Sequence, residues 1–259
     1  MSGGIVQLVA IGAQDAYLTS KPEVSFYRSS YKRYTHFANS VERQLIQGQP
    51  SAGGVSTVRF EKKGDLLSYV YFTARDVNGA IVPNLGWSNV IDKVELLIGG
   101  QVIDTQDFQY MTDVEPVTGA QTWNQRYLNN GNPSTAGNPT NQNITFFPLK
   151  FFFCKDWSVS LPLVALQYHD VVIRITWASG LTNQTTGIVS GTPAYSTLQY
   201  ICWANFVYLD QAEREFFAKN AHDLLITQVQ RIPVGTGAMQ ELALAHPVKF
   251  LAWQSANYP

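Results

Sequence analysis

Residues 170–177 read DVVIRITW, and this short stretch decides the fold class of the sequence. Its odd-numbered positions are all large and apolar: Val171, Ile173, Ile175 and Trp177. Successive side chains of a β-strand point to opposite faces of the sheet. The alternation therefore predicts a strand with one face in the core and the other face half-exposed.

Similar patterns extend outward from this strand in both directions. Residues 66–75 keep apolar side chains on one face, with Ser68 as the exception, whereas residues 198–209 (LQYICWANFVYL) are apolar on both faces. A strand that is apolar on both faces is expected in the centre of a sheet or under a partner. Further strands are predicted over residues 34–47, 55–61, 90–98, 101–103, 146–153 and 157–161. Gly99-Gly100 predicts a tight hairpin turn, and the whole pattern predicts an all-β antiparallel sandwich or barrel.

Two long polar segments, residues 129–143 and 180–193, interrupt the strands and predict surface loops. Each contains an Asn-x-Thr sequence, at Asn143 and at Asn183, which makes these asparagines candidate glycosylation sites. Chance matches to this short motif are common, so the assignment stays a hypothesis.

One helix is predicted over residues 210–225. Asp210 can cap its first turn, and Glu213 three residues later completes a capping-box pattern. An apolar stripe at helical spacing follows, formed by Phe217, Ala221, Leu224 and Leu225. After a Gly-rich turn at residues 235–237, a new strand is predicted from about Glu241 to Trp253. One strand cannot bury itself, so it indicates the start of a second domain.

Composition favours contact between proteins. Hydrophobic residues make up 45% of the chain, aromatic residues 13% and charged residues 14%, and the net charge is -1. No basic stripe is available for phosphates, and a cluster such as Arg28, Lys32 and Arg33 is far more often simply solvated surface, so direct nucleic-acid binding is not expected. Cys154 and Cys202 lie in apolar strands and are expected to be buried, reduced thiols. No secretory signal or membrane span is predicted.

The search for catalytic chemistry is negative. We find no nucleotide-binding, zinc-protease or nucleophile motif, and the four histidines are widely spaced. Asp104 with Asp107, and Asp113 with Glu115, allow two interpretations, a site for a cation or for sugar cleavage, or simple solvation of the loop after the hairpin. Trp87 and Trp123 similarly fit either sugar stacking or core packing. No catalytic residue, metal site or cofactor is therefore predicted.

The most specific motif lies at the N-terminus, where residues 3–37 read GGIVQLVAIGAQDAYLTSKPEVSFYRSSYKRYTHF. It resembles the opening of the major capsid proteins of nucleocytoplasmic large DNA viruses, the phycodnaviruses and their mimivirus-like relatives. Further similarities follow in the family's order: Gly64-Asp65-Leu66, residues 91–100 (IDKVELLIGG), residues 168–171 (YHDV), residues 209–218 (LDQAEREFFA) and residues 246–249 (HPVK).

The resemblance implies a protein of two jelly rolls, three copies of which form a pseudo-hexagonal capsomer of an icosahedral shell. It implies four regions: an N-terminal arm at residues 1–30, a first jelly roll at 31–210, a linking helix and turn at 211–238, and the start of a second, truncated roll at 239–259. Asp210, Glu213, Phe217 and Leu224 would form the junction. The arm would lie near minor capsid proteins or an inner viral membrane, and the protein would assemble in the host cytoplasm and reside in the virion.

The sequence breaks off at the first strand of the family's second roll, so we expect either a fragment or a shortened paralogue. Three alternatives remain at this stage. The first is a minor capsid or penton-type jelly-roll protein. The second is a carbohydrate-binding jelly-roll module that uses Trp87, Trp123 and the acidic loop residues. The third and least favoured is an enzyme on a jelly-roll scaffold.

Overall fold

The computed structural model describes residues 36–82, 85, 87–118, 146–181, 194–232 and 241–253. The chain divides into two compact units, Met1–His36 and Phe37–Pro259, and all the described strands and helices belong to the second unit. The N-terminal arm expected at residues 1–30 lies outside the described residues.

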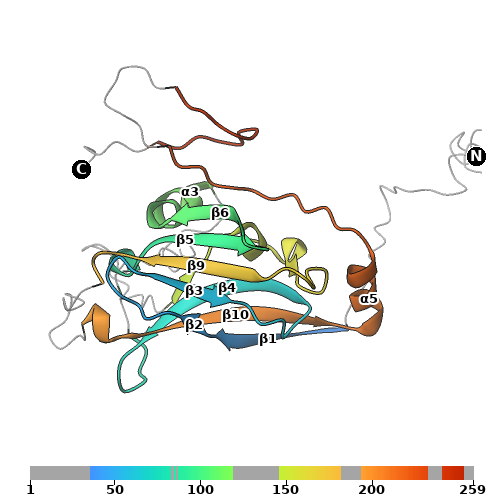
Figure 1. Ribbon diagram of the computed structural model, residues 1–259, viewed down its shortest axis with the longest axis horizontal. Coiled ribbons are helices and arrows are strands. Elements are labelled where there is room, and N and C mark those ends of the chain that lie inside the picture. Colours follow the sequence, from blue (N-terminus) through green and yellow to red (C-terminus); the bar gives the residue numbers. More distant parts are fainter. Residues whose placement is uncertain are drawn as a thin grey trace, which may run out of the picture. The chain divides into compact units, whose positions relative to one another are not determined.

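Within the described residues, ten strands form two five-stranded antiparallel sheets that lie face to face (Figure 1). The first sheet has the order β1-β10-β4-β7, with β8 also paired to β4; its strands are β1 (Phe37–Gln44), β10 (Gln199–Leu209), β4 (Leu66–Arg75), β7 (Phe146–Pro148) and β8 (Leu161–Pro162). The second sheet has the order β2-β3-β9-β5-β6; its strands are β2 (Ile46–Gln47), β3 (Val55–Arg59), β9 (Val171–Trp177), β5 (Ile91–Ile98) and β6 (Gln101–Asp107).

The strand pairs are nested in the sequence, and this nesting identifies a jelly roll. β5 pairs with β6, β4 with β7 and β8, β3 with β9, and β1 with β10. Nested pairs form one long antiparallel ribbon, which rolls up so that its strands divide between two packed sheets. The ribbon's tip is the predicted hairpin, where Gly99 and Gly100 have φ values of 60° and 83° in the left-handed region that favours glycine. The predicted antiparallel sandwich is confirmed.

The core fills the space between the sheets and is rich in aromatic rings. The four predicted inward residues of β9 are buried, and Trp177 donates from Nε1 to the buried Ser56 Oγ at 2.8 Å. The Trp87 ring stacks on Phe147 with 5.5 Å between centroids. Burial raises the pKa of the Cys154 thiol to about 12, and both cysteines are free and buried as expected.

Several short helical turns connect the strands, and some replace predicted strands. They are η1 (Trp87–Asn89), η2 (Tyr110–Val114), α3 (Glu115–Thr118), η3 (Phe152–Cys154), η4 (Trp157–Val159) and η5 (Tyr195–Thr197). The strand predicted at residues 157–161 is mostly wrong, because the Asp156 carboxylate accepts the Trp157 N–H and starts a turn that Ser160 closes by bonding to the Trp157 carbonyl. The strand predicted at residues 146–153 ends early, at Pro148.

The last helix is also shorter than predicted. α5 spans Gln211–Lys219 and does not continue to Leu225. Asn220 leaves the helical conformation, and its backbone N–H and its Nδ2 both donate to the Phe216 carbonyl, which would otherwise lack a partner at the helix end. The strand predicted from Glu241 to Trp253 is wrong for this chain, since residues 241–253 form no strand and pair with no strand among the described residues.

An ion pair across the second sheet makes stability depend on pH. Arg174 Nε donates to Glu95 Oε2 at 2.6 Å from the neighbouring strand, and this hydrogen bond holds the pKa of Glu95 below its usual 4.5. A carboxyl whose pKa is lowered by folding stabilises the fold above its unfolded pKa and loses that contribution as the pH falls through the lowered value. We therefore expect the unfolding free energy to fall as the pH drops below about 4.5, and the Arg174→Gln variant to show a shallower fall. Urea unfolding across acid pH measures both slopes, and equal slopes would contradict the assignment.

Candidate assembly and junction surfaces

The first functional region is the place where the helix after the sandwich is attached to it. Arg214 on α5 donates from Nε to Asp65 Oδ1 at 2.9 Å and from Nη2 to Asp65 Oδ2 at 3.1 Å. The same carboxylate accepts the backbone N–H of Leu209 at 2.7 Å. Planar guanidinium groups bind carboxylates most strongly in this two-point arrangement. Asp65 thus fixes both the end of β10 and the first turns of α5.

Gly64 lets Asp65 reach this position. A Cβ atom at residue 64 would lie 2.6 Å from the Cβ of Phe206, so only glycine fits against β10 there. The Gly64-Asp65-Leu66 and LDQAEREFFA motifs, which are about 150 residues apart in the sequence, therefore meet in space. Arg214 was not among the predicted junction residues, although it lies inside the second motif. The LDQAEREFFA motif was the signal that could have drawn attention to Arg214, but the spacing of residues in the sequence did not predict Asp65 as the partner of Arg214.

The predicted junction residues lie in two places, on the helix α5 with its cap and in the chain beyond the helix. Asp210 caps α5, accepting the Glu213 N–H at 3.0 Å, which confirms the predicted start of the helix. Phe217 packs on His222 with 5.1 Å between ring centroids, and no residue of α5 is buried. Leu224 lies beyond the helix and is 43% exposed. Whether these four residues contact a second domain stays a prediction.

After α5 the chain runs in an extended conformation along β6, the edge strand of the second sheet (Figure 1). Gln228 Nε2 donates to the Ile103 carbonyl, and the Val229 N–H donates to Asp104 Oδ1 at 2.8 Å. Arg231 then pairs with Asp107 at 2.6 Å. These contacts give Asp104 and Asp107 a structural role, because both carboxylates bind the chain segment that follows the sandwich.

Three of the acidic residues considered for a cation or sugar site, those whose side chains the structure describes, are occupied in another way. Asp104 is buried and also accepts from Gln106 Nε2 at 2.7 Å; desolvation raises its pKa. Glu115 forms a buried ion pair with Lys150 at 3.2 Å. Within the described ranges, no group of three or more His, Cys, Asp or Glu side chains could hold a metal ion. The acidic-site interpretation is therefore wrong for Asp104, Asp107 and Glu115.

The sugar-stacking interpretation fails at Trp87. Its ring is fully buried between Phe147 and Tyr200, so neither face is available to a ligand. Trp123 and the candidate glycosylation sites Asn143 and Asn183 lie outside the described residues, as does the side chain of Asp113.

The outer face of the first sheet carries an apolar depression of about 530 Å³. Its aromatic side chains are Tyr69, Tyr71 and Trp157, and Trp157 is 57% exposed. Beside it, the Trp203 indole donates to Thr73 Oγ1 at 2.9 Å. Exposed aromatic rings next to a few polar groups are typical of surfaces that contact other proteins.

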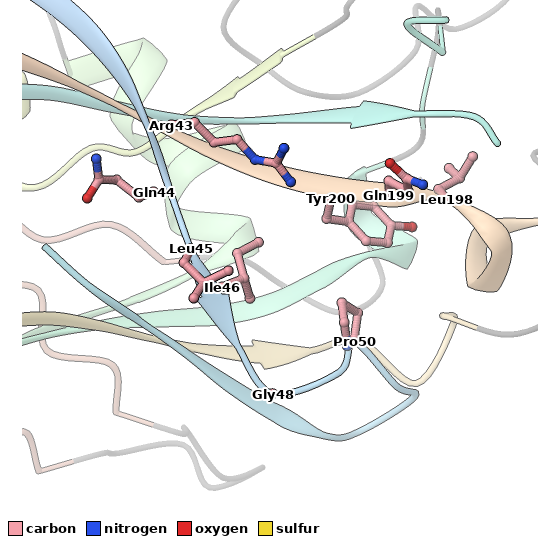
Figure 2. A pocket seen from close by; sticks show the side chains of 9 residues that line it. All are labelled: Arg43, Gln44, Leu45, Ile46, Gly48, Pro50, Leu198, Gln199 and Tyr200. Carbon is pink, nitrogen blue, oxygen red and sulfur yellow. The ribbon is translucent and has the colours of Figure 1, made fainter. Parts of the chain in front are cut away.

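A second depression, of about 440 Å³, lies where the chain passes from β1 of one sheet to β2 of the other (Figure 2). Leu45, Ile46 and Pro50 contribute apolar side chains, and Arg43 is the one charged residue among the nine that line it. The hydroxyl of Tyr200, which also lines this depression, donates to the Tyr195 carbonyl at 2.8 Å. In the part of the chain that the structure describes, no helix has the length and apolarity needed to cross a bilayer.

Comparison with known proteins agrees with this architecture. The family model described as the major capsid protein N-terminus matches residues 25–210. The major capsid proteins of Pyramimonas orientalis virus and Paramecium bursaria Chlorella virus 1 are each 32% identical over 98% of this chain, which covers 65% and 60% of their respective lengths. The chain thus spans less than two thirds of these curated relatives.

A solved structure has the same fold. VP54 of PBCV-1, fitted into a reconstruction of the virophage Sputnik, superposes with a TM-score of 0.59 at 27% identity, over 80% of this chain and 50% of that one. The resemblance first indicated by residues 3–37 and by five shorter motifs is therefore confirmed. The chain belongs to the major capsid protein family of large DNA viruses.

Proposed function

We propose that this chain is the N-terminal part of a structural capsid protein, three copies of which form a pseudo-hexagonal capsomer that tiles an icosahedral shell. The observation that carries the proposal is the nested jelly-roll pairing of β1 through β10 within a region that matches the capsid family model. Rolled sandwiches leave few free sheet edges and offer broad flanks for contact between copies.

The described surfaces support binding and not catalysis. The exposed aromatic depression on the first sheet is a protein-contact surface, and the acidic residues hold the protein's own chain. The proposal includes no enzymatic activity and no cofactor, since the curated relatives are major capsid proteins. The proposal also includes the partners that the family resemblance implies: a second jelly roll, neighbouring capsomers, minor capsid proteins and, through the arm at residues 1–30, an inner viral membrane. Location in the virion and assembly in the host cytoplasm belong to the same proposal.

The native mass of the complete open reading frame product tests the proposal. Light scattering should give three times the mass of a chain longer than 259 residues. A monomer would overturn the capsomer assignment and favour a minor capsid protein of the same viruses.

The junction offers a sharper test, because Phe217 packs on His222 and not in the core. Phe217→Asp should leave the melting temperature of the sandwich nearly unchanged but prevent stable trimers, since a charge would be placed in the junction with the second domain. Phe217→Leu keeps an apolar side chain and should assemble. Normal trimers from Phe217→Asp would remove Phe217 from the junction.

A further inference from the structure

We propose that residues 228–231 are an adapter that fixes the position of whatever follows the sandwich. Residues 228, 229 and 231 bind the β6 edge, and Gln230 binds the following chain. The proposal concerns contacts within this chain; only the identity of the positioned part as a second jelly roll rests on the proposed function.

On one side, the adapter binds to the edge strand β6 as an extended peptide. The outer edge of an edge strand presents unpaired backbone groups, which can bind another extended segment. Here the Ile103 carbonyl accepts from Gln228 Nε2, so an edge group is satisfied by a side chain of the passing segment. Arg231 reaches Asp107 at 2.6 Å farther along the same strand. The two contacts hold the ends of the four-residue segment.

Asp104 supplies the central contact. Asp104 is 2% exposed, and a buried charge is stable only where donors surround it. The donors include Gln106 Nε2 at 2.7 Å from β6 itself and the Val229 N–H at 2.8 Å from the adapter. Because that N–H belongs to the backbone, the carboxylate fixes the position of the main chain and does not depend on the side chain at residue 229.

On the other side, the adapter binds the chain that follows it, through the side chain of Gln230. Its Nε2 donates to the Ala243 carbonyl at 3.0 Å, and its Oε1 accepts the Ala245 N–H at 3.3 Å. A carboxamide has one donor and one acceptor side, as a peptide group has, so this pair imitates a bridge between two strands. Ala245 immediately precedes the His246-Pro247-Val248-Lys249 motif. Gln230 therefore links the position of the adapter to the position of this motif.

Hydrogen exchange on the complete protein, resolved to single amides, can measure whether the Gln230 contacts depend on the contact between Asp104 and Val229. Asp104→Ala should speed exchange of the Val229 amide roughly tenfold, because a bond to a charged acceptor is lost. It should also speed exchange at Ala245, whose partner Gln230 is no longer held. Gln230→Ala should affect Ala245 but leave Val229 protected. The Leu209 amide, which Asp65 binds in the same way, is the internal control and should not change in either variant.

An unchanged Val229 amide in Asp104→Ala would overturn the proposal, as would loss of protection at Val229 in Gln230→Ala. Should Asp104→Ala unfold the sandwich, the more exposed Asp107–Arg231 pair provides the test. Asp107→Arg and Arg231→Asp should each speed proteolysis of the 220–232 segment about fivefold, and the double exchange should restore it to within about twofold. Exchange of the Arg59–Asp170 pair, an exposed ion pair elsewhere on the second sheet, is the control and should leave this cleavage rate unaltered. Failure of the double exchange to restore resistance would also overturn the adapter. A monomeric protein that passes these tests would contradict the proposed function alone.

Discussion

Phe147→Ala is expected to lower the unfolding free energy by about 3–5 kcal/mol, the range for removing a fully buried aromatic ring. Phe147 has no exposed surface and lies between two other rings. Its centroid is 5.5 Å from Trp87 and 5.7 Å from Phe108, and both contacts are stacked. Its backbone also pairs with Phe72 in β4. Removal would leave a cavity that two rigid rings cannot close.

Chemical denaturation of the purified chain measures this loss, and the melting temperature should fall by on the order of 10 °C. Phe216→Ala is the control, since Phe216 is 56% exposed on α5 and should change the unfolding free energy by less than about 0.5 kcal/mol. Equal effects of the two substitutions would show that the ring stack does not form the core.

The sequence predicted the strands well where alternation was strong. β4 and β9 match their predicted ranges closely, because burial on one face imposes period two on the side chains. The pairing of β1 with β10 was not predictable from the pattern, because it joins residues such as Phe37 and Leu209 that are far apart in the chain. Family resemblance, and not periodicity, supplied the jelly-roll order.

The helix end was missed for a local reason. The apolar stripe from Phe217 to Leu225 fits helical spacing, but the side chains of Asn220 and His222 bond the last helical carbonyls and end the helix. Apolar spacing does not show this competition. Leu224 and Leu225 are consequently exposed on an extended segment, where their spacing no longer defines a face.

The junction was predicted only in part, since its strongest contacts join distant segments. Asp210 and Glu213 are local capping residues and were recognisable from spacing. Asp104 and Asp107 were visible in the sequence only as carboxylates, and Asp65 only as part of the Gly64-Asp65-Leu66 motif. Their partners Val229, Arg231 and Arg214 are more than 100 residues away. A carboxylate pattern alone does not distinguish a ligand site from a binding site for the protein's own backbone.

Arg214→Ala is expected to lower the unfolding free energy by about 2–3 kcal/mol, less than for a fully buried pair because the Arg214 side chain is 54% exposed. The reason for the loss is the partner left behind. The Asp65 side chain is 7% exposed, and without Arg214 it loses two charge-assisted hydrogen bonds while its charge remains. The free energy of unfolding from urea titration at neutral pH measures the effect.

Lys219→Ala is the matched control on the same helix. It breaks the exposed pair between Lys219 and Glu215, at 2.8 Å, and should lower the unfolding free energy by only about 0.3–0.5 kcal/mol. If the buried charge is the cause, adding Asp65→Asn to Arg214→Ala should recover roughly 1 kcal/mol, because the asparagine still accepts the Leu209 N–H but carries no charge. An additive double variant would instead mean that Arg214 acts through packing on α5. A coupling energy clearly different from zero would therefore mean that the two family motifs are joined by charge, and a coupling energy near zero that they are joined by shape.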